Sequence, residues 1–250
     1  MSYAGREYPI EGRILRYPTE FRDGRSANGM FLVDSGVANG LIAASGFRVA
    51  EVLPGRALMN LACVHYLDTD CGSYLETAQA FFIERPGGGR RLPWISTWSD
   101  FVRSRVASFT WALQVDTTLS QRCGIEMWGY PKTVERIEAE ESGGEIAFSM
   151  YMDERLVFRY TTRTEGEKTV EPMTAEVFSI YEGTPHVGYL EQSYRDMGVR
   201  FRGGRLELGD HAMSDELRAL GLSTRPLMST WAGHLAFRMS APEKVLLGAV

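Results

Sequence analysis

Large hydrophobic residues recur at every second position in the stretch that follows Glu145. Every second residue is hydrophobic over 146–150, and the alternation resumes over 156–160 after a polar turn at Asp153-Glu154. A period of two is typical of strands that bury one face. The pattern therefore predicts a β-hairpin with one apolar side.

The same reasoning extends along the chain. Strands are predicted over 57–67, 76–84 and 107–115, a second hairpin over 199–208 around Gly203-Gly204, an irregular arm with short strands over 1–30, and short helices over 119–127, 190–197 and 214–220. Strands outnumber helices, and turn residues recur at short intervals. We expect an α+β fold that is mainly antiparallel β, closed or strongly curved. The 250 residues fit one domain spanning 1–250.

Composition narrows the classes of function. The net charge of −5 gives no basic surface for nucleic acid. No apolar run is long enough to cross a bilayer, and the first residues lack the apolar core of a secretory signal, so a cytoplasmic protein is expected. Three cysteines without regular spacing predict neither a disulfide framework nor a metal site.

Lysine is rare enough to be considered residue by residue. Lys168 lies in a charged stretch and Lys244 follows Glu243, so both are expected in solvent. Lys132 instead follows the apolar and aromatic stretch 127–131. Burial there would disfavour its charged form and leave a nucleophilic amine. The alternative is a lysine whose stem lies on an aromatic ring while its ammonium reaches water.

Three segments, in order, resemble the acetoacetate decarboxylase superfamily. The segment 124–132, Gly-Ile-Glu-Met-Trp-Gly-Tyr-Pro-Lys, is similar to the family's signature around its reactive lysine. The segment 72–80 resembles a Tyr-x-Glu-x-x-Gln element, and Asp210-His-Ala-Met213 resembles a C-terminal element of the family.

The resemblance implies a cone-like closed β-barrel with a largely apolar central cavity, in a homo-oligomer without metal or cofactor. Lys132 would form a Schiff base with a small keto acid, and Glu76 would be the active-site carboxylate. Tyr130 and Met213 are candidates for the apolar wall, and Trp128 for a residue that reshapes the pocket. A decarboxylase of a β-keto acid is the leading hypothesis.

The chain also departs from the family's pattern. Thr133 stands where the decarboxylase has a second lysine, and a second carboxylate is replaced by Asn60 or Leu61. Arg25 falls in the stretch where the family has an arginine that meets the substrate carboxylate, although Arg22 would serve as well. An aldolase-dehydratase acting on a 2-oxo acid, or a non-catalytic barrel that binds an apolar ligand, therefore remain open.

Overall fold

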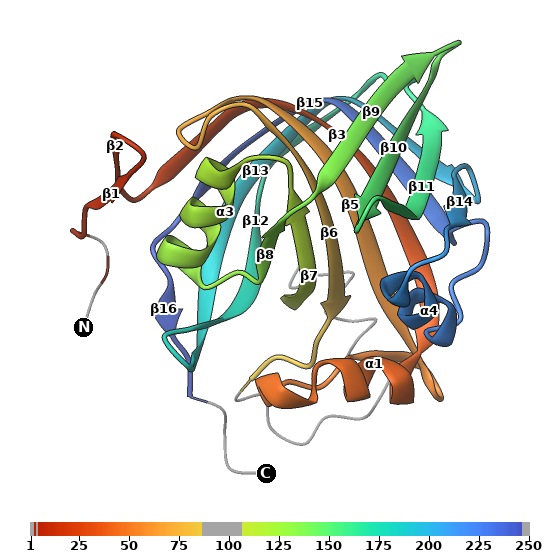
Figure 1. Cartoon of the computed structure of the whole chain (residues 1–250), viewed down its shortest axis with the longest axis horizontal. Helices are drawn as coiled ribbons and strands as arrows, with labels where there is room; N and C mark the ends of the chain where they lie inside the picture. Colours follow the sequence, from red (N-terminus) through yellow and green to blue (C-terminus); the bar gives the residue numbers. More distant parts are fainter. Residues whose placement is uncertain (1–2, 4, 87–106, 247–250) are drawn as a thin grey trace.

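A computed structural model describes residues 3, 5–86 and 107–246. Its main sheet is strongly curved, and successive strands pair in the order β12, β13, β15, β3, β5, β6 and β7. A parallel pairing between β7 and β12 returns the sheet to its first strand and closes a ring of hydrogen-bonded strands (Figure 1). These strands are β3 (Thr19–Asp34), β5 (Arg56–Thr69), β6 (Tyr74–Phe82), β7 (Ala107–Val115), β12 (Lys168–Tyr181), β13 (Thr184–Phe201) and β15 (Met228–Met239).

Shorter strands extend this ring. The strand β8 (Lys132–Val134) runs parallel to β7, β4 (Glu51–Leu53) pairs with β5, and β16 (Glu243–Lys244) pairs with β13. A separate hairpin of β1 (Tyr8–Ile10) and β2 (Arg13–Leu15) precedes the sheet.

A second, antiparallel sheet lies against the outer face of the ring. It consists of β9 (Arg136–Ser142), β10 (Glu145–Met152), β11 (Arg155–Arg163) and β14 (Arg205–Leu208). On β5, Met59 and Leu61 point to a core shared with Phe148 of β10 and Phe158 of β11. The alternate residues of β5 point to the inside of the ring, where they line a cavity. Strand alternation thus gives each wall of the ring one face for packing and one for a ligand.

Helices are short and sit at the edges of the sheets. They are α1 (Ser35–Leu41), the 3₁₀ turn η1 (Ala43–Ser45), α3 (Thr118–Cys123), the π-helical turn η2 (Gly124–Trp128) and α4 (Ala212–Ala219). Both α1 and α4 contribute buried side chains to the core between the sheets. The helix α3 leads directly through η2 toward β8.

The predicted fold class is confirmed: the chain is mainly antiparallel β, and its curved sheet closes around a central cavity. The hairpin over 145–160 and the helices near 119–127 and 214–220 are also confirmed.

Three local predictions were wrong. The predicted irregular arm has its short strands only up to Leu15, and residues 19–34 form one long strand because they pair with β15 along one edge and with β5 along the other. Residues 190–197 belong to β13, where pairing with β12 and β15 outweighs local helical preference. The segment after Gly203-Gly204 pairs with β11 instead of folding back on β13.

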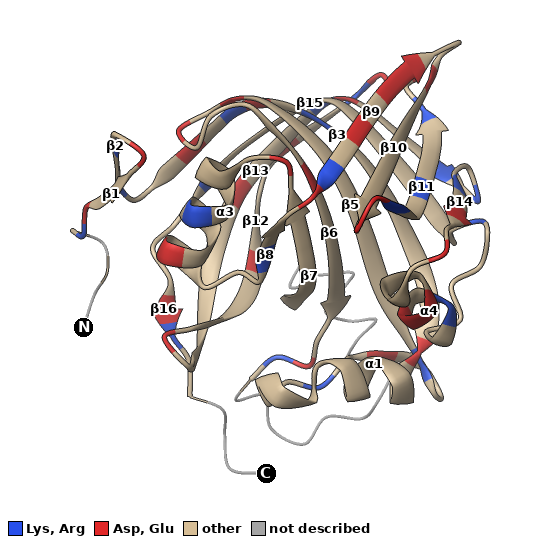
Figure 2. Ribbon diagram, viewed as in Figure 1, with Lys and Arg blue, Asp and Glu red and all other residues tan. Residues whose placement is uncertain are grey.

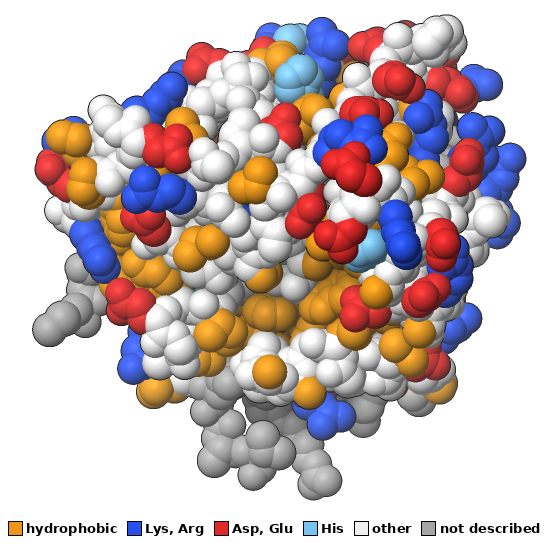
Figure 3. All heavy atoms as spheres, viewed as in Figure 1, with side chains coloured by type: hydrophobic (Ala, Val, Ile, Leu, Met, Phe, Trp, Pro, Cys, Tyr) orange, Lys and Arg blue, Asp and Glu red, His pale blue; other side chains and the backbone are white. Residues whose placement is uncertain are grey.

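Charged residues lie mainly on the outer strands and loops, including β9 and α4 (Figure 2). On the face shown in Figure 3, hydrophobic side chains gather around a central hollow, and charged side chains crowd the region above it. None of the described helices has the length and apolar character needed to span a membrane.

Candidate active site

Lys132 is buried at the start of β8, and its side chain ends inside the ring. The lysine residue is 8% exposed. Its Nζ donates to Glu76 Oε2 at 2.8 Å and to Ser120 Oγ at 3.1 Å. The alternative of an ammonium reaching water is therefore excluded, since the charge is held by a buried carboxylate.

Two glycines shape the chain so that this lysine can enter. A Cβ on Gly124 would lie 2.4 Å from Cδ of Lys132, so the lysine stem crosses the space that the missing side chain leaves. Gly129 ends η2 with φ of 71° and would place a Cβ 2.4 Å from the carbonyl oxygen of Ile180. Only glycine fits both demands at position 129. The π-turn between them is a feature often found at functional sites.

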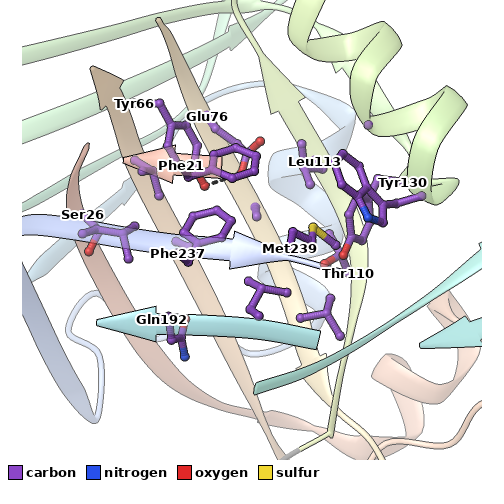
Figure 4. A pocket seen from close by; sticks show the side chains of 18 of the residues that line it. Phe21, Ser26, Tyr66, Glu76, Thr110, Leu113, Tyr130, Gln192, Phe237 and Met239 are labelled. Atoms are coloured by element: carbon purple, nitrogen blue, oxygen red, sulfur yellow. Dashed lines mark hydrogen bonds between the residues drawn. The ribbon is translucent and has the colours of Figure 1, made fainter. Parts of the chain in front are cut away.

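Glu76 comes from β6 and is also buried, at 8% exposure. Its second oxygen, Oε1, accepts a hydrogen bond of 3.3 Å from the hydroxyl of Tyr66 (Figure 4). Burial, and then the negative charge of Glu76, raises the pKa of the Tyr66 hydroxyl well above its ordinary value. Tyr66 therefore stays protonated and can keep donating to the carboxylate.

Tyr74 forms another wall of the lysine site. The ring centroid of Tyr74 lies 5.1 Å from Nζ of Lys132, close enough for a cation–π contact. Burial raises the pKa of the Tyr74 hydroxyl well above its ordinary value, with Glu76 adding to the effect. The amine is thus surrounded by one carboxylate, one hydroxyl and aromatic surface.

The cavity beyond Lys132 is about 230 Å³ in volume. Phe21 and Phe237 stack with ring centroids 4.1 Å apart and present a flat apolar wall. Among the described lining residues, Glu76 and Lys132 are the only charged ones. A carbonyl compound bound here would meet a mostly apolar surface with a single ion pair.

Two thiols also line this cavity. Cys71 and Cys123 are buried, and both are free. A hydrogen bond with Cys71 and the positive charge of Lys132 lower the pKa of Cys123 despite its burial. The same hydrogen bond, together with burial, raises the pKa of Cys71.

The residues predicted from sequence fall into two groups. Lys132, Glu76, Trp128 and Tyr130 all line the cavity. Trp128 is fixed by a hydrogen bond of 2.9 Å from its Nε1 to the carbonyl oxygen of Ser240.

Arg25 and Met213 lie elsewhere. Arg25 precedes the inward-facing Ser26 on β3, so it points outward, where its exposed guanidinium pairs with Glu141 at 3.1 Å. Met213 of α4 is buried in the core between the two sheets, and its sulfur lies 3.8 Å from Nε2 of Gln114. Neither residue is among those that line this cavity.

Sequence reasoning missed Ser120, Tyr66 and Tyr74. The predicted strand began at Glu76 and left Tyr74 out, whereas β6 begins at Tyr74, which lies two residues before Glu76 and therefore shares its face. Ser120 and Tyr66 reach the site through the packing of α3 and the pairing of β5 with β6, which no local pattern reveals. In the part of the chain that the structure describes, no cluster of three or more His, Cys, Asp or Glu side chains could hold a metal ion.

Comparisons with known proteins agree with this architecture. The sequence model of the family described as acetoacetate decarboxylase matches residues 7–242. A search of curated proteins finds no match. A solved acetoacetate decarboxylase is 17% identical with a TM-score of 0.64, and the match covers 94% of this chain and 92% of that one. The acetoacetate decarboxylase from Legionella pneumophila is 15% identical with a TM-score of 0.64, covering 94% and 91%.

A third similar structure is the enduracididine biosynthesis enzyme MppR complexed with pyruvate. It is 14% identical with a TM-score of 0.62, and the match covers 96% of this chain and 95% of that one. At these identities the solved structures support the fold, whereas the family model covers nearly the whole sequence. The chain belongs to the acetoacetate decarboxylase family.

Proposed function

We propose that this protein is a lyase that forms a Schiff base between Lys132 and a small keto acid, and that it decarboxylates a β-keto acid. The observation that carries the proposal is the placement of Nζ, 2.8 Å from Glu76 Oε2 inside an apolar cavity. A buried amine next to a proton acceptor has what a carbonyl nucleophile requires.

The chemistry follows from that pair. Glu76 accepts a proton from Lys132, and the neutral amine adds to the ketone carbon to give a carbinolamine. Glu76 returns the proton to the carbinolamine hydroxyl, which leaves as water, and an iminium forms. The bond to the carboxylate then breaks, carbon dioxide leaves, and the electron pair moves to the iminium nitrogen through an enamine. Protonation of the enamine carbon and addition of water release the ketone and regenerate the amine.

Neighbouring side chains hold this pair in place. Ser120 accepts from Nζ at 3.1 Å and Tyr66 donates to the second oxygen of Glu76 at 3.3 Å, so both partners keep a fixed orientation. Thr133 is exposed, as expected for the residue after an inward-facing one on a strand. A cation at position 133 would therefore face away from Lys132, and its absence is compatible with catalysis.

Aldol addition is a second candidate, since the same enamine could attack an aldehyde in place of a proton. It is favoured by the space beside the reacting groups, because the cavity continues past Lys132 over Ala62 and Ala78. Loss of water from the adduct would complete an aldolase-dehydratase reaction on a 2-oxo acid.

Reductive trapping tests the shared step. The protein is incubated with acetoacetate or pyruvate, reduced with borohydride and digested, and the adduct is located by peptide mass. We expect the adduct on Lys132, none in Lys132→Met, and full labelling in Lys168→Met, a matched change of an exposed lysine. A folded wild-type protein that forms no adduct with any keto acid tested would contradict the proposed Schiff base and favour a non-catalytic barrel.

Product analysis separates the two reactions. Release of carbon dioxide from acetoacetate supports the decarboxylase, whereas consumption of an added aldehyde together with pyruvate supports the aldolase. A homo-oligomer in the cytoplasm remains our expectation for assembly and location. Light scattering of the purified protein tests the subunit number.

A further inference from the structure

The inner face of β5 changes in character along its length. Starting from the catalytic end, its cavity-lining residues are Tyr66, Val64, Ala62 and Asn60. Val64 is paired with Glu76 on the next strand, so it marks the level of the reactive groups. Asn60 lies four residues further along, about 13 Å at roughly 3.3 Å per residue. The side chains on this wall thus change from aromatic at Tyr66 to small and aliphatic at Ala62, and then to an amide at Asn60.

Ala62 and Ala78 belong to a row of paired residues that crosses neighbouring strands of the sheet. Lys132 pairs with Leu113, Leu113 with Ala78, Ala78 with Ala62, and Ala62 with Asn28, each on the neighbouring strand. All five residues line the cavity. Ala62 and Ala78 are only half-buried although they face inward, so open space lies above them. This alanine pair leaves a passage from the lysine to the amide end.

The far end of the passage is polar but uncharged. Asn28, Asn60 and Gln192 line it and are half-buried. Asn28 Nδ2 donates to Thr230 Oγ1 at 3.1 Å, and Gln192 Oε1 accepts from the Tyr194 hydroxyl at 2.9 Å, which leaves other amide atoms of both side chains for a ligand. In Figure 4 the ring of Phe237 lies between Glu76 and Gln192. Neutral donors and acceptors therefore face the cavity at some distance from the reactive groups.

Charge decides which ligand group suits this end. The only charges among the described lining residues are Glu76 and Lys132, at the other end. A second carboxylate bound near Asn60 would lose its water without a cation to replace it, which is costly. A hydroxyl or carboxamide would instead exchange water for amide partners.

We propose that the site takes keto acids whose side chain is elongated and ends in a neutral hydrogen-bonding group. The keto acid end meets Lys132, the chain lies over Ala62 and Ala78, and the terminal group binds at Asn60. This inference rests on the proposed function for the position of the reacting carbonyl.

Two readouts test it separately. Pyruvate, 2-oxooctanoate, the ω-carboxamide of 2-oxosuberate and 2-oxosuberate itself are compared by borohydride trapping. Calorimetry then measures binding of the corresponding 2-hydroxy acids, which cannot form an iminium. We expect the carboxamide to bind about fivefold more tightly than the methyl-terminated chain, as one added hydrogen bond predicts, and the dicarboxylate to bind most weakly.

Variants locate the passage. Ala62→Leu is expected to weaken binding of the elongated 2-hydroxy acids roughly tenfold or more relative to binding of lactate, and its circular dichroism spectrum checks that the variant folds. Asn60→Leu is expected to abolish the preference for the carboxamide over the methyl group.

The outcomes are distinct. Trapping of pyruvate with no gain from chain length or terminal group, or an unchanged preference of Ala62→Leu for the elongated ligands, would overturn the inference and leave the proposed function standing. Preferential binding of the carboxamide without any adduct would overturn the proposed function and leave the preference for an elongated, neutral ligand standing.

Discussion

Gly124→Ala tests whether Lys132 follows the path that the structure gives it. The backbone at Gly124 is right-handed helical, with φ of −64°, so alanine suits it. The new Cβ would lie 2.4 Å from Cδ and 2.5 Å from Cε of Lys132. Carbon atoms pack at about 3.5–4.0 Å, so the lysine stem must move by about 1 Å or more.

Displacement of the Lys132 side chain is expected to lower the rate of trapping strongly and the free energy of unfolding only slightly. A shift of this size breaks the 2.8 Å contact between Nζ and Glu76. Misplacement of a reacting group by about 1 Å lowers rates about 100-fold. A hydrogen bond between charged groups contributes about 1.5–3 kcal/mol, and replacing glycine by alanine in a helix returns up to about 1 kcal/mol. We expect trapping to slow about 100-fold while the free energy of unfolding falls by no more than about 2 kcal/mol.

The assay is borohydride trapping beside chemical denaturation. Gly40→Ala is the matched control, because Gly40 lies in α1 and nothing surrounds its missing Cβ within 4 Å. It is expected to trap at the wild-type rate. Trapping by Gly124→Ala within a few-fold of wild type would refute the reasoning, because the lysine would then not need the space over the glycine. A loss of more than about 4 kcal/mol would show instead that the glycine supports the fold.

Further predictions concern the groups around the amine. Glu76→Gln leaves Lys132 without its counter-charge, so trapping is expected to slow by about 100-fold or more, and the free energy of unfolding to fall by about 3 kcal/mol, both measured as above. Burial raises the pKa of Tyr66, so its contribution to stability is complete below about pH 10 and lost as pH rises through the folded-state value. Tyrosinate absorbance from Tyr66 is thus expected only with alkaline unfolding, and titration of Tyr66→Phe identifies its share. The pKa of Cys123 is lowered first by the hydrogen bond with Cys71, so Cys71→Ala is expected to shift alkylation of Cys123 by iodoacetamide to higher pH, more than Lys132→Met does. Alkylation profiles that stay unchanged in both variants would contradict this assignment.

Local patterns predicted what depends on neighbours along the chain. The alternation over 145–160 predicted its hairpin because one face is buried, and the rarity of lysine singled out Lys132. Glu76 was identified by family resemblance, and its inward orientation then follows from strand alternation.

The remaining features depend on pairing between distant strands. Arg25 and Ser26 are adjacent, and only the register of β3 against β5 decides which of them faces the cavity. A shift of one residue would exchange them. Ser120 reaches Lys132 because η2 turns the chain back, and a π-turn has no distinctive sequence pattern. The orientation of Ser26 and the contact between Ser120 and Lys132 therefore depend on how distant segments pair in the closed ring, and no short segment of the chain specifies that pairing.

The alanine pair connects the reaction to its specificity. A buried ion pair such as Lys132–Glu76 gains little stability over apolar packing, because both groups lose their water. Ser120 and Tyr66 offset part of that loss by occupying the positions where water would otherwise bind. The cavity continues past this pair over Ala62 and Ala78, so a side chain of the substrate can extend there without displacing Ser120 or Tyr66. The two alanines would then determine which side chain the keto acid can carry.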